Sequence, residues 1–598
     1  MSGDCDCGAT RDTANENCRI LLDVLMAQGV DTIVISPGSR NTPLTIGAAA
    51  RPKLRKYLIT DERTAAFTAL GIAMASQRPV ALACTSGTAL YDYAPAIAEA
   101  YYQKIPLIVI SADRPAQWID QDDSQTLHQY EALDKIVKRS YDIYTETGMS
   151  TPCANPEYAS EREWFVNRVA NEAVLTATHG IPGPVHINMQ FGNPLNHTTE
   201  CCGSYARAVR VIENESGLPP HTLRELSEYL RGRRIMVVAG FMQPDDSLNR
   251  AVADFARLEN VTVLCETISN LHLGGHAQMI DSLLTRLTDA EKASMRPDVV
   301  ISIGGSLVSR MLKEYIRSCT GAEHWTLADT PVSVDCFQRL TTHVDVTPRR
   351  FFKGLASMSR HIARKFPAVA STGYREMWQQ ARERVYRSDA SRLETQPWSE
   401  LKALAQVFRS LPRECDLFLS NGTCVRYAQL LLDKMPHACR CNRGVSGIDG
   451  TNATAFGNSL AYRGMTLLVT GDMSFAYCPE VMNLRRLGGD LRIVVVNNAG
   501  GGIFRFIGTT RELDIREQYF CCDPQLPVER LTEAYGWNYR SARNETELEE
   551  ALRYLLDTPA TLLEIQVDPQ TSADTLINWL STPPAAGVEC RGLMPTES

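Results

Sequence analysis

The sequence lacks the features that would place the chain in a membrane, outside the cell or on nucleic acid. No run of eighteen or more apolar residues is present, so no segment predicts a transmembrane helix. The first twenty residues have neither the basic start nor the apolar stretch of a signal peptide, which favours a cytoplasmic location. The net charge of −8 gives no overall basic footprint for nucleic acid. We therefore expect a cytoplasmic protein, without membrane insertion, whose partners are small molecules.

Metal-binding cysteine motifs are absent as well. The chain has 18 cysteines, but neighbours such as Cys5 and Cys7, or Cys439 and Cys441, never form paired CxxC motifs. We expect most of the cysteines to be reduced thiols that are buried as small hydrophobic side chains.

The sequence does contain a regular alternation of short apolar runs with helix-length segments. Runs such as "DTIVIS", "RIMVVAG" and "LRIVVV" recur in three blocks, which we assign to residues 1–199, 200–379 and 380–598. A chain of 598 residues is too long to fold around a single hydrophobic core. We therefore expect three α/β domains with doubly wound parallel sheets. No fixed-period repeat links the outer blocks, so a duplication stays open. No GxGxxG motif follows the strands of the middle block, which argues against bound FAD or NAD there.

Two polar motifs end neighbouring strands of the third block. The run "MTLLVT" is followed by Gly471 and Asp472 and then by a helix expected over 481–487, and "LRIVVV" is followed by Asn498. A right-handed crossover brings the carboxyl ends of two such parallel strands to the same sheet edge. The Asp472 carboxylate, the Asn498 amide oxygen and the Gly500 carbonyl are hard oxygen donors that suit magnesium, with phosphate oxygens completing the shell. The sequence therefore predicts a metal-bound diphosphate, although either motif alone would more often mark a structural turn.

A single glutamate stands out in the first block. Glu62 follows an expected strand and opens the Ala-rich segment "TAAFTALGIAMA". A carboxylate held against a ligand in a dry cleft would have a raised pKa, suited to accepting and returning a proton. The structural alternative is a first-turn glutamate that only complements the helix dipole.

Several motifs together resemble one enzyme family. The segments "ISPGSRNTPL", "TDERTAAFTALGIA", "ISADRPA", "NRGVSGIDGT" and "VVVNNAGGGIF" resemble the 2-succinyl-5-enolpyruvyl-6-hydroxy-3-cyclohexene-1-carboxylate synthases of menaquinone biosynthesis, which use thiamine diphosphate. The resemblance spans both outer blocks and, more faintly, the middle one. It implies a pyrimidine-binding first domain, a Rossmann-like central domain and a diphosphate-binding third domain.

The resemblance also implies the cofactors and their ligands. Thiamine diphosphate and magnesium, or manganese in its place, would be bound, with Asp472, Asn498 and Gly500 holding the metal and Glu62 activating the cofactor. Met473 stands where the family usually has a third glycine. The other implied cofactor contacts are Ser420, Asn421, Ile448, Gly471, Met473, Ser474, Ile503 and Phe504.

The implied reaction is decarboxylation of 2-oxoglutarate followed by 1,4-addition of the succinyl unit to isochorismate. Both substrates carry carboxylates, which arginine forks bind well. Gln125 is implied as a catalytic residue near the reacting carbon. The implied substrate ligands are Ser39, Arg40, Arg114, Arg310, Asn421, Arg426 and Arg443. Ser309 replaces a lysine that family members often carry, so the contact expected at Arg310 differs from theirs.

Two other interpretations stay open at this point. One is a different thiamine diphosphate enzyme, such as an acetolactate synthase or another 2-oxoacid decarboxylase, and the number of matched arginines argues against it. The other is a binding or regulatory protein that keeps the fold without catalysis, against which Glu62 and Asp472 argue. The family's sites lie between subunits, so we expect a homodimer or a homotetramer.

Overall fold

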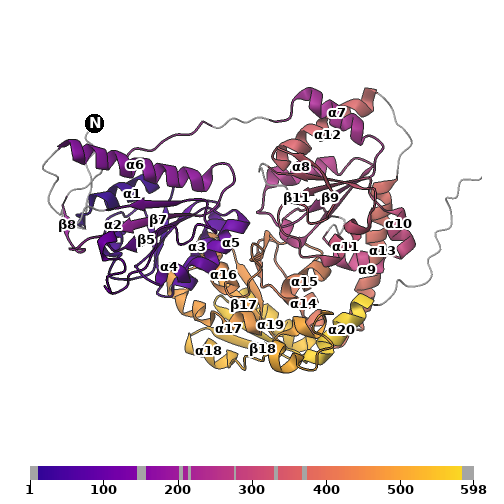
Figure 1. The fold of residues 1–598 in the computed structure, drawn as a ribbon. Coiled ribbons are helices and arrows are strands. Elements are labelled where there is room, and N and C mark those ends of the chain that lie inside the picture. Colours follow the sequence, from indigo (N-terminus) through magenta and orange to yellow (C-terminus); the bar gives the residue numbers. More distant parts are fainter. Residues whose placement is uncertain are drawn as a thin grey trace, which may run out of the picture.

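The computed structural model describes residues 11–144, 156–200, 206–212, 217–274, 278–328, 334–365 and 373–581 (Figure 1). Three parallel sheets, each covered by helices on both faces, lie side by side, and they fall one in each of the three blocks expected from the sequence. The exact domain boundaries stay a prediction. No helix in the described part of the chain combines the length and apolarity needed to cross a bilayer.

The N-terminal domain has a six-stranded sheet in the order β3-β2-β4-β5-β7-β6. Its strands are β2 (Thr32–Ile35), β3 (Arg55–Leu58), β4 (Val80–Cys84), β5 (Leu107–Asp113), β6 (Ser140–Ile143) and β7 (Val185–Gln190). Its helices are α1 (Glu16–Ala27), α2 (Thr42–Ala49), α3 (Glu62–Ser76), α4 (Ala89–Asp92), α5 (Ala94–Gln103), η1 (Ala116–Trp118) and α6 (Pro156–Thr178). A short antiparallel pair joins β1 (Asp12–Thr13) to β8 (Thr198–Thr199).

The central domain has a five-stranded sheet in the order β10-β9-β11-β12-β13. Its strands are β9 (Ile235–Ala239), β10 (Val261–Cys265), β11 (Val299–Ile303), β12 (Glu323–Leu327) and β13 (Leu340–Val344). Its helices are α7 (Pro220–Leu230), α8 (Asp246–Phe255), η2 (Thr267–Ser269), α9 (Ile280–Arg286), α10 (Asp289–Ser294), α11 (Arg310–Ser318) and α12 (Pro348–Lys365). Helix α13 (Tyr374–Glu394) runs through the boundary expected near residue 380 and buries Trp378 and Val385 in the central core.

The C-terminal domain has a six-stranded sheet in the order β15-β14-β16-β17-β19-β18. Its strands are β14 (Asp416–Leu419), β15 (Ala438–Arg440), β16 (Thr466–Gly471), β17 (Leu491–Asn497), β18 (Asn538–Ala542) and β19 (Thr561–Gln566). Its helices are α14 (Glu400–Arg409), α15 (Thr423–Leu431), α16 (Thr451–Ala461), α17 (Asp472–Ala476), η3 (Pro479–Leu487), η4 (Gly502–Arg505), η5 (Glu517–Cys521), α18 (Val528–Ala534), α19 (Glu545–Asp557) and α20 (Pro569–Ser581).

The two outer sheets share one topology. Numbered from the first strand of each sheet, both have the spatial order 2-1-3-4-6-5. The sequence alone left a duplication open, and this common order of parallel strands supports it.

The segment after Asp472 differs from its expected form. Instead of one α-helix, the short α17 is followed by the 3-10 helix η3, which begins at Pro479. A proline has no backbone N–H to continue the preceding helical turn, so the chain restarts there in a tighter helix. The apolar spacing still buries Val481, Met482 and Leu484.

The outer domains are joined through the crossing of α3 and α16, which Figure 1 shows side by side. A Cβ atom at Gly71 would lie 2.0 Å from the Thr454 carbonyl oxygen, and one at Gly457 would lie 2.0 Å from the Thr68 carbonyl oxygen. Only glycine permits backbones to approach this closely. One continuous hydrophobic core therefore runs from Leu82 of β4 to Leu468 of β16.

The described cysteines are all free, and all of them except Cys336 and Cys522 are buried. Burial of the thiols agrees with the expectation of small hydrophobic side chains.

Candidate active site

Asp472 lies directly after β16, as the sequence predicts. Strand β17 runs parallel to β16 with Gly471 opposite Val496, so Asp472 and Asn498 both follow the carboxyl edge of the sheet. The Asp472 carboxylate is buried and accepts hydrogen bonds from the backbone N–H groups of Met473 at 2.7 Å and Gly500 at 2.8 Å. Burial raises the pKa of this carboxyl above its ordinary value, which a nearby cation would oppose.

Asn498 presents an unsatisfied amide oxygen. Its Nδ2 donates to Oε1 of Glu400 at 2.6 Å, whereas its Oδ1 is buried and has no hydrogen-bond partner among the residues that the structure describes. A buried polar atom without a partner is costly, so this oxygen is open to a ligand. An amide oxygen beside a buried carboxylate is a donor set that fits magnesium.

The Gly500 carbonyl has a partner that the sequence did not indicate. Nη1 of Arg505 donates to it at 2.8 Å and also donates to the Asn498 carbonyl at 3.2 Å, while the guanidinium pairs with Glu517 at 2.9 Å. A carbonyl oxygen has two lone pairs, so one remains for a metal.

Gly500 and Gly501 of this loop pack closely against the backbone of a neighbouring segment of the same chain. Cβ atoms at Gly500 and Gly501 would lie 2.3 Å and 2.6 Å from backbone atoms of Cys521, at the end of η5. The backbone N–H of Gly501 donates to the Met473 sulfur at 3.1 Å, so the residue in place of the third glycine contacts this loop. Close approach of the loop to a diphosphate stays a prediction.

The other C-terminal candidates form a connected group around this edge. The Ser474 hydroxyl donates to the Ile448 carbonyl at 2.7 Å, and the Gly471 N–H donates to the Ser420 hydroxyl at 3.3 Å. The Asn421 amide donates to the Gly447 carbonyl at 2.8 Å. Ile503 and Phe504 lie in η4 and are half-buried, and the Phe504 ring lies 5.7 Å from that of Phe520.

Glu62 is the first residue of α3 and is half-buried. The preceding Asp61 caps the helix by accepting the Thr64 N–H at 2.7 Å. Burial, with smaller contributions from the carboxylates Asp92 and Asp61, raises the pKa of the Glu62 carboxyl. The adjacent Arg63 donates to the Tyr477 carbonyl at 2.6 Å, which ties the start of α3 to the residue after α17.

Arg40 and Arg114 form the first of two arginine pairs. Burial, followed by the charge of Arg114, lowers the pKa of Arg40, whose Nη1 donates to the Phe191 carbonyl at 2.8 Å. Arg114 pairs with Asp123 at 2.5 Å and donates to the Ser124 hydroxyl at 3.0 Å. Two neighbouring guanidinium groups favour a nearby anion, and the carboxylates of Asp123 and Asp113 partly offset their repulsion in this fold.

Arg426 and Arg443 form the second pair. Burial, followed by the charge of Arg443, lowers the pKa of Arg426. Nη1 of Arg443 donates to the Asn421 amide oxygen at 2.9 Å, so three of the implied substrate ligands lie together.

Ser39 and Gln125 lie on exposed turns of the N-terminal domain. The Ser39 carbonyl accepts the Thr42 hydroxyl at 2.7 Å. Gln125 has a positive φ of 55° and lies against Gly87, where a Cβ would be 3.6 Å from that of Gln125.

Arg310 does not join the other candidates in the described contacts. Its side chain is 85 % exposed and pairs with Glu314 one helical turn along α11, at 2.8 Å. Ser309, in contrast, is buried: it caps α11 by accepting the Leu312 N–H at 3.0 Å, and its hydroxyl donates to Asp281. The role of Arg310 in substrate binding stays a prediction.

Two residues at this sheet edge, Glu400 and Arg505, are not indicated by the sequence. Glu400 lies 98 residues before Asn498, and Arg505 directly follows Ile503 and Phe504 in the sequence. Nothing in the local pattern of either residue distinguishes it from a surface charge.

Comparison with known proteins matches both outer domains to thiamine enzymes. Residues 18–132 match the family "Thiamine pyrophosphate enzyme, N-terminal TPP binding domain", and residues 421–565 match "Thiamine pyrophosphate enzyme, C-terminal TPP binding domain". A solved benzoylformate decarboxylase from Polynucleobacter necessarius has a TM-score of 0.67 and 16 % identity, covering 93 % of this chain and 99 % of its own. The expected α/β fold class is thereby confirmed.

Relatives with a common name align along nearly the whole chain. The 2-succinyl-5-enolpyruvyl-6-hydroxy-3-cyclohexene-1-carboxylate synthase of Porphyromonas gingivalis is 36 % identical over 570 residues, covering 94 % of this chain and 96 % of the relative. That of Flavobacterium johnsoniae is 34 % identical over 547 residues, with 90 % and 93 % covered.

Proposed function

The chain belongs to the family of 2-succinyl-5-enolpyruvyl-6-hydroxy-3-cyclohexene-1-carboxylate synthases, and from this premise we propose its reaction. It is a thiamine pyrophosphate enzyme, a transferase that forms a carbon–carbon bond with decarboxylation in menaquinone biosynthesis. It removes carbon dioxide from 2-oxoglutarate and adds the remaining succinyl unit to isochorismate.

The pair formed by Asp472 and Asn498 carries this proposal. A buried carboxylate and a buried amide oxygen that has no partner among the described residues lie at one sheet edge. They suit magnesium, or manganese, and the Gly500 carbonyl supplies a third oxygen. The metal would fix the diphosphate of the cofactor at this edge. When bound, thiamine diphosphate supplies the electron sink for loss of carbon dioxide.

Glu62 is the proposed proton carrier. Its carboxyl would hydrogen-bond the pyrimidine ring of the cofactor and exchange one proton with it. The raised pKa caused by burial brings this carboxyl closer to the pH at which it can both hold and release that proton.

The two arginine pairs are the proposed carboxylate receptors. Arg40 and Arg114 come from the N-terminal domain, and Arg426 and Arg443 come from the C-terminal domain. In each pair burial, and then the neighbouring cation, lower the pKa of one member, and a bound carboxylate would oppose both effects. Gln125, Ser39 and Asn421 are proposed to orient the substrates beside them.

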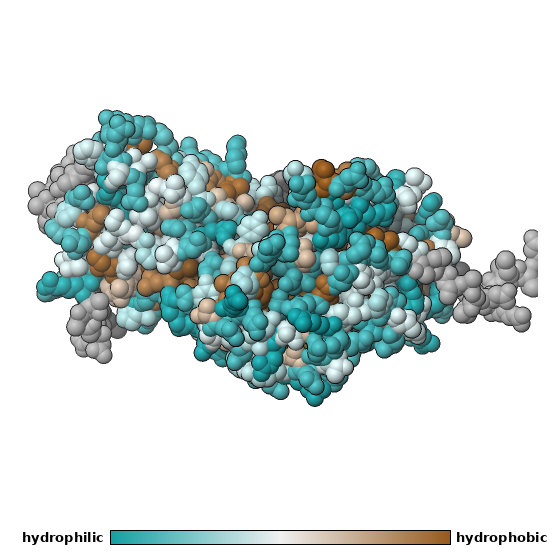
Figure 2. Space-filling model, turned by 90° about the horizontal axis from the view of Figure 1, so that it is seen from below, coloured by the Kyte–Doolittle hydropathy of each residue, from teal (hydrophilic) through white to brown (hydrophobic). Residues whose placement is uncertain are grey.

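We also propose that the enzyme acts in the cytoplasm as a homodimer or homotetramer with sites between subunits. Apolar side chains are exposed on both outer domains, among them Tyr91 (48 %), Tyr102 (59 %), Val445 (48 %) and Tyr477 (44 %). Figure 2 shows apolar residues gathered in the left and central parts of the face seen from below. A second copy of the chain would cover such side chains.

The decisive experiment follows the loss of isochorismate with purified protein, 2-oxoglutarate, magnesium and thiamine diphosphate, leaving out one component at a time. The expected result is loss that requires every component, with the succinyl adduct as product. Release of carbon dioxide that is indifferent to isochorismate would instead identify a thiamine-dependent decarboxylase and overturn the proposal.

A further inference from the structure

Glu400 touches the proposed metal site from outside the two strands that form it. It is the first residue of α14, its side chain is buried, and its Oε1 lies 2.6 Å from Nδ2 of Asn498. The charges of Asp472 and Arg505 and the Thr423 hydroxyl all act on this carboxyl, whose second oxygen, Oε2, has no hydrogen-bond partner among the described residues. The contact therefore links α14 to the end of β17.

The hydrogen bond fixes the orientation of the Asn498 side-chain amide, with its nitrogen toward Glu400. A side-chain amide has a donor end and an acceptor end, and a carboxyl oxygen that carries no proton, such as the acceptor Oε1 in this hydrogen bond, cannot donate. With its nitrogen held by Glu400, the amide must turn its oxygen the other way. That oxygen is the buried Oδ1 atom that has no partner in the described part of the chain.

We propose that Glu400 is a positioning residue that holds the Asn498 amide with its oxygen directed at the metal. The inference rests on the metal site of the proposed function and adds a residue to it. Outer residues that orient metal ligands typically change metal affinity by about 10- to 100-fold when they are replaced.

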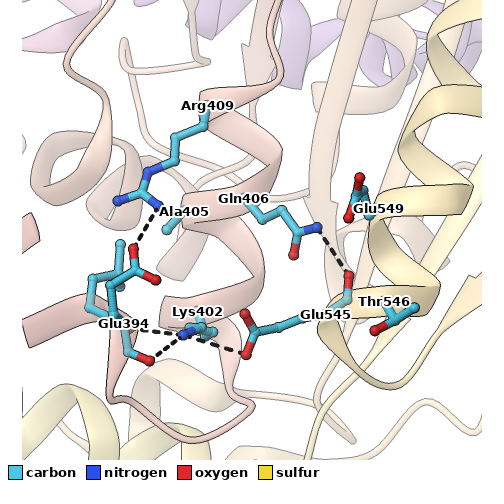
Figure 3. Close-up of a pocket in the computed structure, with 9 residues that line it drawn as sticks. Glu394, Lys402, Ala405, Gln406, Arg409, Glu545, Thr546 and Glu549 are labelled. Atoms are coloured by element: carbon cyan, nitrogen blue, oxygen red, sulfur yellow. Dashed lines mark hydrogen bonds and ion pairs between the residues drawn. The ribbon is translucent and has the colours of Figure 1, made fainter. Parts of the chain in front are cut away.

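Helix α14 is anchored independently of the site. Nζ of Lys402, two residues after Glu400, donates to the carbonyls of Leu393 at 3.1 Å and Glu394 at 2.8 Å, and it lies 3.4 Å from the Glu545 carboxylate. Figure 3 shows Lys402 between Glu394 and Glu545, on the wall of a cavity of about 220 Å³. These contacts hold the end of α13 and the start of α19 against α14, so Glu400 is presented by a fixed helix.

The space around the pair leaves the amide little freedom. A Cβ at Gly502 would lie 2.3 Å from Nδ2 of Asn498 and 3.1 Å from Oε1 of Glu400. A methyl group there would push directly on the hydrogen bond, which provides a second way to disturb the amide while Glu400 stays intact.

Two substitutions at Glu400 separate orientation from charge. Glu400→Gln removes the charge but keeps an oxygen that accepts from Nδ2, whereas Glu400→Met removes both. Binding of Mn²⁺ to the full-length protein with thiamine diphosphate, measured by electron paramagnetic resonance, should stay within about 3-fold of wild type for Gln. For Met it should weaken by about 10-fold or more.

Equal losses in the two variants would mean that the charge of Glu400 acts alone and would overturn the proposal, as would full affinity in the Met variant. Gly502→Ala should weaken Mn²⁺ binding as Met does, and it keeps the test valid should Glu400→Met not fold. Arg409→Met is the matched control on α14: it removes only an exposed ion pair with Glu394 at 3.5 Å and should leave Mn²⁺ affinity unchanged.

Failure of the proposed reaction would look different. A wild-type protein that binds thiamine diphosphate and Mn²⁺ but does not consume isochorismate would overturn the reaction and leave the role of Glu400 measurable. A wild-type protein that binds no Mn²⁺ would overturn both.

Discussion

Glu99 of α5 accepts the backbone N–H of Val445 at 2.8 Å, although 346 residues separate them. Its other oxygen accepts the N–H of Gly444 at 2.6 Å, so one buried carboxylate holds two successive amides. These amides lie in the loop between Arg443 and Ile448, the residues proposed for substrate and cofactor binding. The N-terminal domain thus sets the position of a loop that belongs to the C-terminal domain.

Glu99→Gln should impair substrate binding more than folding. The new NH₂ group would face a backbone N–H, and a buried donor without an acceptor costs about 1–3 kcal/mol. A shifted loop would misplace the neighbouring Arg443, so we expect kcat/KM for isochorismate to fall by about 10-fold, the equivalent of about 1.4 kcal/mol. Steady-state kinetics would measure this loss.

The neighbouring Gln103 supplies the control for Glu99. Its Nε2 donates to the same carboxylate without touching the loop amides, so Gln103→Leu should leave kcat/KM close to wild type. A Glu99→Gln enzyme with a lower melting temperature but normal kcat/KM would show that Glu99 serves stability only.

Glu62 and Asp472 should fail in different ways. Glu62→Gln removes the proposed proton carrier, and loss of a general acid–base typically costs about 100- to 10,000-fold in turnover while the cofactor still binds. Asp472→Ala should instead weaken magnesium-dependent binding of thiamine diphosphate. Calorimetric titration of the cofactor, together with kcat at saturation, distinguishes the two effects. Normal turnover in Glu62→Gln, or normal cofactor binding in Asp472→Ala, would remove the corresponding role.

The proximity of Asp472 and Asn498 was predictable because it follows from the local sequence and the topology of the sheet. Parallel strands joined by a right-handed crossover align their carboxyl ends, so the residues after "MTLLVT" and "LRIVVV" had to meet, and Asp472 and Asn498 do follow adjacent strands. Glu400 and Glu99 were not predictable. Each acts through hydrogen bonds made by a helix that is distant in sequence, and the position of a helix and the rotamers of its side chains are set by tertiary packing.

Ser309 and the segment after Asp472 show the same limit. The sequence marked Ser309 only as a missing lysine, whereas its hydroxyl caps α11 and contacts Asp281 in the fold. The apolar spacing of 481–487 correctly indicated a buried helical face, but Pro479 decided that the helix would be of the tighter kind.

Gly71→Ala should destabilise the junction of the outer domains severely. A methyl group at this position would lie 2.0 Å from the Thr454 carbonyl oxygen, and rigid backbone cannot give way as a side chain can. Overpacking costs about 1–3 kcal/mol in ordinary cores, so we expect a loss of at least about 3 kcal/mol in unfolding free energy. Gly508→Ala is the control, because a Cβ there meets no atom within 4 Å. Equal urea midpoints for the two variants would contradict the close crossing of α3 and α16.

His186 should make the stability of the protein depend on pH. Its imidazole is buried on β7 beside the Ser111 hydroxyl at 2.7 Å, and burial lowers its pKa from 6.5 to about 3. Below about pH 6.5 the unfolded chain therefore binds a proton at this histidine, whereas the native protein does not. The free energy of unfolding is highest above that pH and decreases as the pH falls. One proton contributes about 1.4 kcal/mol per pH unit, which gives a loss of about 2 kcal/mol between pH 6.5 and pH 5.

The substitution His186→Gln tests this prediction because it removes the titrating group. The difference in unfolding free energy between wild type and variant should change by about 2 kcal/mol between urea titrations at pH 7 and at pH 5. A difference that is the same at both pH values would show that the native protein admits the proton at His186.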